Sequence, residues 1–366
     1  MRTQNIQEAL QILKNEEAKA RDFIAPKSKI QMRIKDPDAV EELQAFQTEP
    51  RLVIDESTVM PLDPWAHEQL AGKLEIPVKY YWKMKGAAPD LLVNNVNTWL
   101  QKKEADGKNE QRFLIRTTGS EVRAFLSDKY KPVPNTSVAY TVLDALTHIQ
   151  GPGFDVKECA VSDTTMYLKI TSNQAVYMNP QKEGGDAWYP GIMVRNSEVG
   201  ASKVQVDVYT WRQWCKNGAI LTNGLSKVHL GRKIGGDGEV FFSDKTEELD
   251  IKTVLSAMSD VVKQVFVPEK MNELMERVKA GQKVEVEDKV LAVNNICQKF
   301  KIPEHEQDEI LARFEGSNQY ELGNSITSLA RDTESEDRQI KLEEIGGDVL
   351  LLDEKAFRSI TIRKEE

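Results

Sequence analysis

Cysteine is scarce in this chain, and the spacings that hold metals or build disulfide frameworks are absent. Cys159, Cys215 and Cys297 lie far apart, and none belongs to a CxxC motif or a Cys/His cluster, so neither a zinc site nor a disulfide framework is indicated. No apolar run approaches the roughly 18–20 residues that cross a bilayer, and the charged amphipathic start lacks the apolar region of a secretory signal. The sequence therefore predicts a protein of a reducing cytoplasm with no membrane partner.

A phosphate-binding loop is also missing. Glycines gather between residues 231 and 238, but the GxxxxGK[ST] pattern is absent and no helix clearly follows. We interpret this segment as a loop between the last strand of a sheet and a helical region. Nothing in the sequence indicates a bound nucleotide, so we expect no cofactor and no ATPase activity.

Acidic residues are missing from one long stretch of a chain that is acidic as a whole. The net charge is −9, and residues 301–350 carry 5 basic and 13 acidic residues, a balance of −8, so the rest is close to neutral. Between Asp207 and Asp237 there is no Asp or Glu, and residues 209–236 read YTWRQWCKNGAILTNGLSKVHLGRKIGG. Cations interleaved with rings suit single-stranded nucleic acid, because cations bind phosphates and rings stack on bases. A basic surface strand beside core tryptophans is the alternative.

The patterning along the 366 residues predicts an α+β fold in three parts. We expect a mainly helical N-terminal region (1–105), a central antiparallel sheet domain with a basic β-hairpin (106–245) and an acidic helical C-terminal region (246–366). The hairpin joins 112–117 to 121–127 through Thr118-Gly119-Ser120. A helix over 135–149 follows, and then strands at 154–161, 165–171, 191–195, 203–211 and 218–229.

The hairpin and the later strands supply the residues of the predicted nucleic-acid site. Alternation places Phe113, Ile115, Val122, Ala124 and Leu126 on one hairpin face and Arg112, Arg116, Arg123 and Phe125 on the other. The candidate rings are Tyr130, Tyr209, Trp211 and Trp214. The candidate cations are Arg112, Arg116, Arg123, Lys129, Lys131, Lys203, Arg212, Lys216, Lys227, Arg232 and Lys233. Such a site binds with steep salt dependence and little sequence preference, although core packing is the alternative for each tryptophan.

The sequence patterns that would indicate catalysis are weaker than those that indicate nucleic-acid binding. Cys215, His229 and Glu198 have the residue types of a nucleophile, a base and an orienting carboxylate, but their spacing matches no hydrolase signature. We interpret Arg195 and Glu198, in RNSEVG, as a structural ion pair at a sharp turn. Carboxylates that could converge in a sheet on metal ions are Asp155, Asp163, Glu198 and Asp207. The paired carboxylates of the C-terminal region, including Glu343 and Glu344, are expected on exposed helix faces.

Four segments resemble a family of phage/plasmid-like proteins long labelled a domain of unknown function. They are RAFLSDKYKPVPN (123–135), RNSEVG (195–200), CKNGAILTNG (215–224) with His229 soon after, and NSITSLARDTESEDRQIKLEEIGGDVL (324–350). The resemblance spans roughly residues 74–352. It implies a mobile-element protein, from a phage or a plasmid, made in a bacterial cytoplasm.

The order of the predicted elements also resembles the core of single-strand annealing proteins, including phage recombinases. This fold-level resemblance implies a basic groove and assembly into homo-oligomeric rings or filaments. It favours a non-enzymatic, ATP-independent protein that binds single-stranded DNA and anneals strands in recombination, with a single-strand-binding or replication protein as a further partner. The alternatives are a metal-dependent nuclease acting on DNA and a phage regulatory or host-inhibiting protein that acts through protein–protein contacts.

Overall fold

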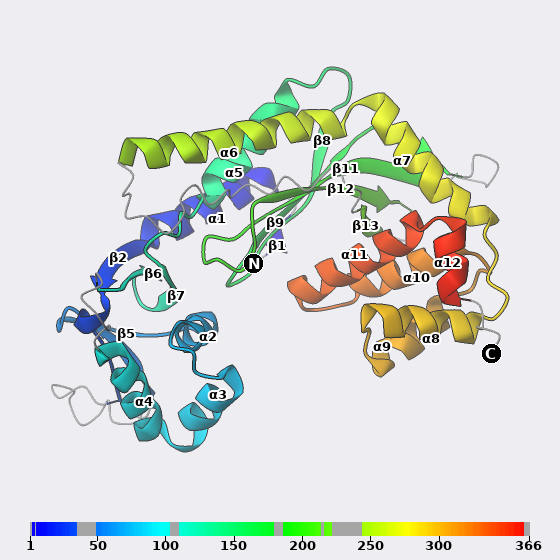
Figure 1. Cartoon of the computed structure of the whole chain (residues 1–366). Helices are drawn as coiled ribbons and strands as arrows, with labels where there is room; N and C mark the ends of the chain where they lie inside the picture. The colour runs from blue at the N-terminus through cyan, green and yellow to red at the C-terminus, as the bar shows by residue number, and fades with distance from the viewer. Residues whose placement is uncertain are drawn as a thin grey trace.

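In the residues that the structure describes, the protein has an α+β fold with three antiparallel sheets and a C-terminal helical region, as predicted in outline. The computed structural model describes residues 2–3, 5–34, 49–102, 110–178, 186–213, 216–221 and 244–361. Within these residues the largest sheet follows a path of six strands, and seven helices, α6 to α12, follow it in the chain. Figure 1 shows the N-terminal sheets, the large sheet and the C-terminal helices arranged along an arch.

In its described residues, the N-terminal part holds two small sheets and three helices around one core. One sheet consists of β2 (Arg21–Pro26), β6 (Arg112–Thr117) and β7 (Val122–Ser127), and the other of β3 (Ile30–Arg33), β4 (Arg51–Ile54) and β5 (Thr58–Pro61). The helices are α2 (Pro64–Lys73), α3 (Val78–Ala87) and α4 (Pro89–Gln101). A single apolar cluster runs from Ala25 to Phe125. This core therefore crosses the boundary predicted at residue 105, and the region contains strands as well as helices.

Local signals explain how this part is built. The Asp63 carboxylate accepts a hydrogen bond from the backbone N–H of Ala66 at 2.6 Å, and Pro64 begins α2, so the helix start is capped. The amide side chain of Asn97 in α4 donates to the Met32 carbonyl (2.9 Å) and accepts from the Met32 N–H (2.8 Å). These two hydrogen bonds replace those that a neighbouring strand would make, and they protect the free edge of β3.

The hairpin belongs to the N-terminal part and not to the large sheet, because β6 pairs with β2. A bulge near Arg116 and Thr117 shifts the pairing by one residue, so the predicted faces of Ala124, Phe125 and Leu126 in β7 are wrong, whereas those of the β6 residues are as predicted. Phe125 stacks on Phe113 inside the core, with ring centroids 4.6 Å apart. Arg116 lies on the face opposite Phe113 and Ile115, as predicted, but Ala124 and Leu126 share that face with it instead of joining the apolar one.

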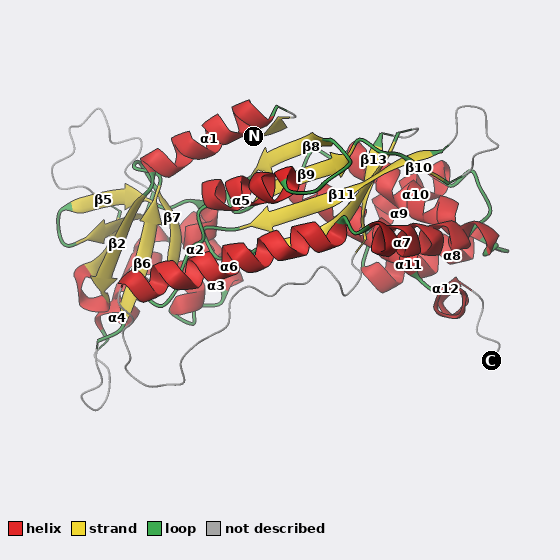
Figure 2. Cartoon of the chain, turned by 90° about the horizontal axis from the view of Figure 1, so that it is seen from above, coloured by secondary structure: helices red, strands yellow, loops and turns green. Residues whose placement is uncertain are grey.

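The large sheet forms the centre of the molecule, with helices on both faces. Its path is β1 (Arg2–Thr3), β8 (Phe154–Val161), β9 (Met166–Ser172), β11 (Ala187–Asn196), β12 (Gln205–Arg212) and β13 (Asn217–Leu221), and β10 (Val176–Tyr177) pairs with β11. The main core lies between one face and α1 (Ile6–Lys19), α5 (Asn135–Thr147), α6 (Asp244–Val265) and α7 (Pro268–Ala280). Figure 2 shows α5 and α6 lying along the sheet.

The remaining helices form a separate core at the other end of the arch. They are α8 (Lys289–Phe300), α9 (Glu304–Arg313), α10 (Gln319–Arg331), α11 (Glu336–Leu351) and α12 (Glu354–Thr361). Helix α11 lies against the second face of the large sheet. Its C-terminal half is very close to β13, because a β-carbon at Gly347 would lie 2.0 Å from the Ile220 carbonyl oxygen.

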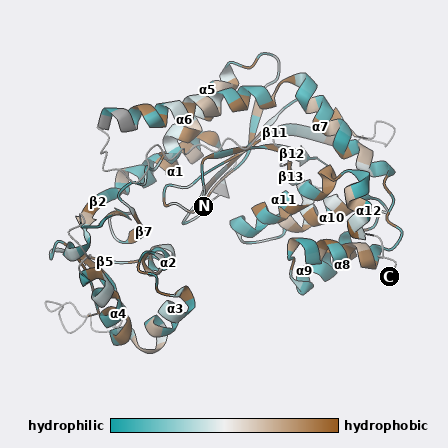
Figure 3. Cartoon of the chain, viewed as in Figure 1, coloured by the Kyte–Doolittle hydropathy of each residue, from teal (hydrophilic) through white to brown (hydrophobic). Residues whose placement is uncertain are grey.

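The described helices mix polar and apolar residues, as Figure 3 shows by the alternation of teal and brown along each of them. Among the residues that the structure describes, no helix is both long enough and apolar enough to cross a membrane.

Candidate nucleic-acid interface

Two of the predicted phosphate-binding arginines are buried in structural ion pairs. Arg116 donates from Nε to Asp22 Oδ1 at 3.0 Å and from Nη1 to the Glu198 carbonyl at 2.6 Å. Arg212 donates from Nε and Nη2 to the two carboxylate oxygens of Asp186, at 2.7 and 2.9 Å. The prediction that these arginines lie on an open basic face is therefore wrong. The alternating pattern shows which residues share a face but not what another element places against it.

The predicted ion pair between Arg195 and Glu198 is also wrong. Arg195 lies in β11, where its guanidinium pairs with Asp207 at 3.0 Å and with Glu344 of α11. Glu198 lies beyond the strand end, 3.7 Å from Arg123, and accepts a hydrogen bond from the Asn135 N–H at 2.7 Å. The strand directs residue 195 onto the sheet face, whereas the turn directs residue 198 toward the hairpin.

The RNSEVG turn joins the N-terminal part to the large sheet. The indole N–H of Trp65 and the amide of Gln69 donate to the Val199 carbonyl at 3.0 and 2.7 Å. The Tyr130 hydroxyl donates to the Ser197 carbonyl at 2.9 Å, and burial raises the pKa of this tyrosine. Tyr130, predicted to stack on bases, is therefore a half-buried residue of this junction.

Apart from Trp211, the other predicted site residues fall into three groups. Five cations have exposed side chains: Arg112, Lys129, Lys131, Lys203 and Lys216. Arg123 is half-buried beside Glu198, and Tyr209 is 2% exposed, with a pKa well above its ordinary value because of burial. Trp214, Lys227, Arg232 and Lys233 lie outside the described residues, as do Cys215 and His229.

Among the described residues, Trp211 is a predicted ring that remains partly accessible, and it belongs to a cluster that we call the aromatic platform: Lys157, Tyr189 and Trp211. The β11–β12 register places Tyr189 opposite Trp211, with ring centroids 5.8 Å apart. The Lys157 ammonium lies 4.6 Å from the centroid of Trp211 and 5.7 Å from that of Tyr189. All three side chains are half-buried, so part of each remains open to a ligand.

The same sheet face continues inward from the platform, beneath helix α11. Lys169 is 1% exposed and lies between Glu158 (2.7 Å) and Glu343 of α11 (2.8 Å). Burial raises the pKa of Glu343 despite this lysine. The expectation that Glu343 and Glu344 lie on an exposed helix face is therefore wrong. Sequence reasoning treated α11 as a solvated acidic stretch, and the cations that it contacts lie about 150 or more positions earlier in the chain.

Other chemistry is limited in the described part of the chain. Cys159 and Cys297 are buried, and burial raises the pKa of each thiol to about 11, which is the environment of an inert cysteine. No three His, Cys, Asp or Glu side chains of the described residues come together as a metal-ligand set. Of the carboxylates considered for a metal site, Asp207 and Glu198 instead face arginines.

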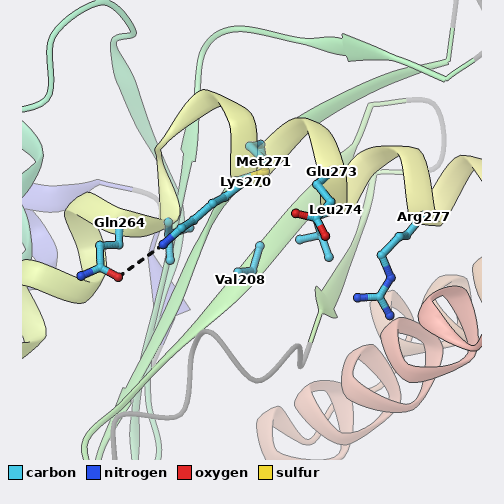
Figure 4. A pocket seen from close by; sticks show the side chains of 8 residues that line it. Val208, Gln264, Lys270, Met271, Glu273, Leu274 and Arg277 are labelled. Carbon is cyan, nitrogen blue, oxygen red and sulfur yellow. Dashed lines mark hydrogen bonds between the residues drawn. The ribbon is translucent and has the colours of Figure 1, made fainter.

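A small cavity lies where α6 and α7 meet β12 (Figure 4). Val208, Met271 and Leu274 form its apolar lining, and Lys270 donates to the Gln264 carboxamide at its rim at 3.4 Å. Its volume of about 40 Å³ has room for water but not for a ligand of ordinary size, which needs roughly 300 Å³ or more. We do not assign a site to it.

Acid is expected to destabilise the protein through His67. This side chain is buried, and burial together with Lys85 lowers its pKa from 6.5 to about 3. Because the folded-state pKa is the lower one, the stability from neutral His67 is fully present above pH 6.5 and is lost as pH falls toward 3. The loss is about 2 kcal/mol at pH 5.

Urea unfolding at pH 5 and pH 7 tests this prediction with the wild type and His67→Gln. The comparison between proteins is needed because Asp63, whose pKa burial raises to about 6, changes stability in the opposite direction over the same range. We expect the variant to lack about 2 kcal/mol of the pH-dependent loss. The same pH dependence in both proteins would contradict the role of His67.

Comparisons with protein-family models, with curated proteins and with solved structures find no match to this chain. The functional conclusion therefore depends on the residues of the site alone.

Proposed function

We propose that the protein binds single-stranded DNA through the aromatic platform and promotes annealing of complementary strands in phage or plasmid recombination. The observation that carries this proposal is the half-exposed pair Tyr189 and Trp211 beneath the Lys157 ammonium, on the face of an antiparallel sheet. A single-strand site without sequence preference needs at least rings that stack on bases and, beside them, a cation that binds phosphate.

Binding at the platform requires Lys157 to move. Its ammonium lies over the ring faces, where a cation–π contact at a partly exposed position contributes roughly 0.5–1 kcal/mol. A base stacked on the same rings contributes about 1–3 kcal/mol, and the flexible lysine can then turn toward the phosphate of that nucleotide. The exchange is favourable, because the ring contact is replaced by a stronger one and the cation, which now lies 3.7 Å from the Asp155 carboxylate, gains the phosphate as an anionic partner.

Annealing needs no cofactor under this proposal, since base pairing supplies the free energy. Rings that stack on one face of a base leave its pairing edge free to meet a complementary strand. We further propose a homo-oligomer that aligns long strands, and a host single-strand-binding or replication protein as a partner of the acidic C-terminal helices. We also propose that this protein is related to the phage/plasmid-like proteins and to the single-strand annealing proteins.

The direct test is binding of the purified protein to labelled oligo-dT across a salt series, with duplex DNA in parallel. We expect binding that prefers the single strand and weakens steeply with salt, followed by faster annealing of complementary oligonucleotides. No binding at low salt would contradict the proposal and favour a protein partner. Strand cleavage that requires Mg²⁺ or Mn²⁺ would favour the nuclease instead.

Replacing Trp211 by leucine is expected to weaken oligo-dT binding about 5- to 150-fold, the loss that corresponds to about 1–3 kcal/mol for one stacked base. Leucine keeps apolar bulk against the neighbouring cluster and removes the ring. Trp99→Leu is the matched control, because Trp99 lies on α4, away from the large sheet, and is 40% exposed. Its ring centroid also has a lysine ammonium nearby, that of Lys102 at 4.9 Å. Equal affinities of the two variants would exclude the platform as the binding site.

A further inference from the structure

We infer that helix α11 is an internal competitor of nucleic acid: its N-terminal half covers the inner part of the platform's own sheet face, and single-stranded DNA displaces it. This inference rests on the proposed function, because it concerns the regulation of the same site. The evidence for it is an arrangement of a ring and a lysine that occurs twice on the sheet. One of the two pairs is the half-buried platform, and the other lies beneath α11.

The repeat lies along β12 and its neighbours. Trp211 and Tyr209 are two positions apart in β12, so their side chains share one face. The Lys157 ammonium lies 4.6 Å from the Trp211 ring, and the Lys169 ammonium lies 5.7 Å from the Tyr209 ring. Each ring thus has a lysine over it, which is the combination that single-stranded DNA needs, twice in succession.

Helix α11 supplies anions to the covered copy. Glu343 contacts the Lys169 ammonium at 2.8 Å, and Glu344 pairs with the Arg195 guanidinium. These carboxylate oxygens hold the same kind of position, at hydrogen-bond distance from a lysine and an arginine, that phosphate oxygens take in a nucleic-acid complex. The helix therefore presents negative charge to the sheet, as the phosphate backbone of a DNA strand would.

The contact of this half of α11 with the sheet is mainly polar. Within the described residues, the apolar cluster that contains Tyr209 and Met193 includes a single residue of α11, Ile340. Buried ion pairs contribute little net stability, since desolvation offsets most of the attraction. An incoming anion can take over the attraction without new desolvation of Lys169 and Arg195, so replacement of carboxylates by phosphates has a small net cost.

The C-terminal half of α11 is held differently and can act as the pivot. Gly347 packs directly against the Ile220 backbone of β13, and Leu350 belongs to the main core. Movement about this contact would uncover the sheet face toward the junction with the N-terminal part. Lys203 lies eight residues before Trp211, a distance of about 26 Å along an extended strand. The displaced state thereby joins the platform to exposed Lys203, which follows the RNSEVG turn, over a length that fits several nucleotides.

The test compares two double variants of the full chain that change the net charge equally. Glu343→Gln with Glu344→Gln removes the anions over the sheet, and Glu309→Gln with Glu354→Gln removes two that pair with Arg313 and Arg358 within the helical region, away from α11. We expect the first variant to bind oligo-dT at least about fivefold tighter than the wild type, within the usual range of coupling between sites. The second is expected to bind within about twofold of the wild type. Equal gains in both, or no gain in the first, would overturn the inference.

A second measurement does not depend on variants. Hydrogen exchange of the wild type is expected to accelerate at the amides of 336–344 when oligo-dT is bound, because the helix leaves the sheet. Unchanged or slower exchange there would overturn the inference. The two proposals fail separately: no oligo-dT affinity in any variant contradicts the proposed function, whereas Trp211-dependent binding that the Glu343 and Glu344 changes leave unaltered contradicts only the competitor role.

Discussion

Replacement of Arg212 by methionine is expected to lower the free energy of unfolding by about 3–5 kcal/mol, the loss that follows when one partner of a buried ion pair is removed. Arg212 is 5% exposed and binds both carboxylate oxygens of Asp186. Its guanidinium also lies 5.3 Å from the Tyr320 ring centroid, and the Tyr320 hydroxyl donates to the same carboxylate. Methionine fills similar volume but leaves Asp186 as a buried anion without its cation.

Urea-induced unfolding measures this loss, and Lys216→Met is the matched control. Both residues belong to the acid-free stretch, but Lys216 is exposed, so its replacement is expected to change stability by no more than about 0.5 kcal/mol. If the Arg212 variant unfolds at the same urea concentration as the wild type, the pair with Asp186 is not structural. The result also decides how DNA-binding data on Arg212 variants are interpreted, because a folding defect would lower binding without any contact to DNA.

Replacement of Glu198 by alanine is expected to destabilise the protein by about 3 kcal/mol and to loosen the junction between the N-terminal part and the large sheet. The Glu198 carboxylate lies within 3.9 Å of Arg116 and 3.7 Å of Arg123, and all three side chains are largely buried. Its Oε1 also accepts the Asn135 N–H at the start of α5. Alanine therefore leaves two buried cations with less compensation and removes the acceptor for a backbone donor.

Glu198→Gln separates these two contributions. Glutamine keeps an acceptor for the Asn135 N–H and loses the charge, so we expect a smaller loss than with alanine. Glu121→Ala is the control, since Glu121 is an exposed carboxylate at the tip of the same hairpin. Urea unfolding measures stability, and limited proteolysis at the RNSEVG turn measures exposure of the junction. Stability and proteolysis unchanged by both Glu198 variants would show that this carboxylate does not hold the two parts together.

The proposed site is still a single-strand-binding surface, but the structure changes which residues we assign to it. Trp211 and the exposed lysines remain candidates, whereas Tyr209 lies beneath α11. Lys157 and Tyr189 are additions that sequence reasoning missed. A register for β11 and β12 would have found Tyr189, because the two strands are antiparallel and Trp211 faces it directly. Lys157 follows from no local pattern, since it reaches the rings from β8 at a bulge.

The sequence alone determined the elements whose signals are local. Alternation and turn residues predicted β8 at its observed bounds, and the helix predicted over 135–149 begins at its observed start, Asn135, because hydrogen bonding within a few residues sets where such elements begin and end. Even α11 has its own start signal, with Ser335 accepting from the Arg338 N–H.

Tertiary structure alone decided which charges are available. Arg116, Lys169, Arg195 and Arg212 look alike in the sequence as basic residues of strands, and each is instead paired with carboxylates from distant segments. The one-residue bulge in the hairpin and the docking of α11 on the sheet depend on contacts across the whole chain. Alternation determines which side chains share a face, but the burial of that face depends on the element that packs against it, and no local pattern encodes that choice.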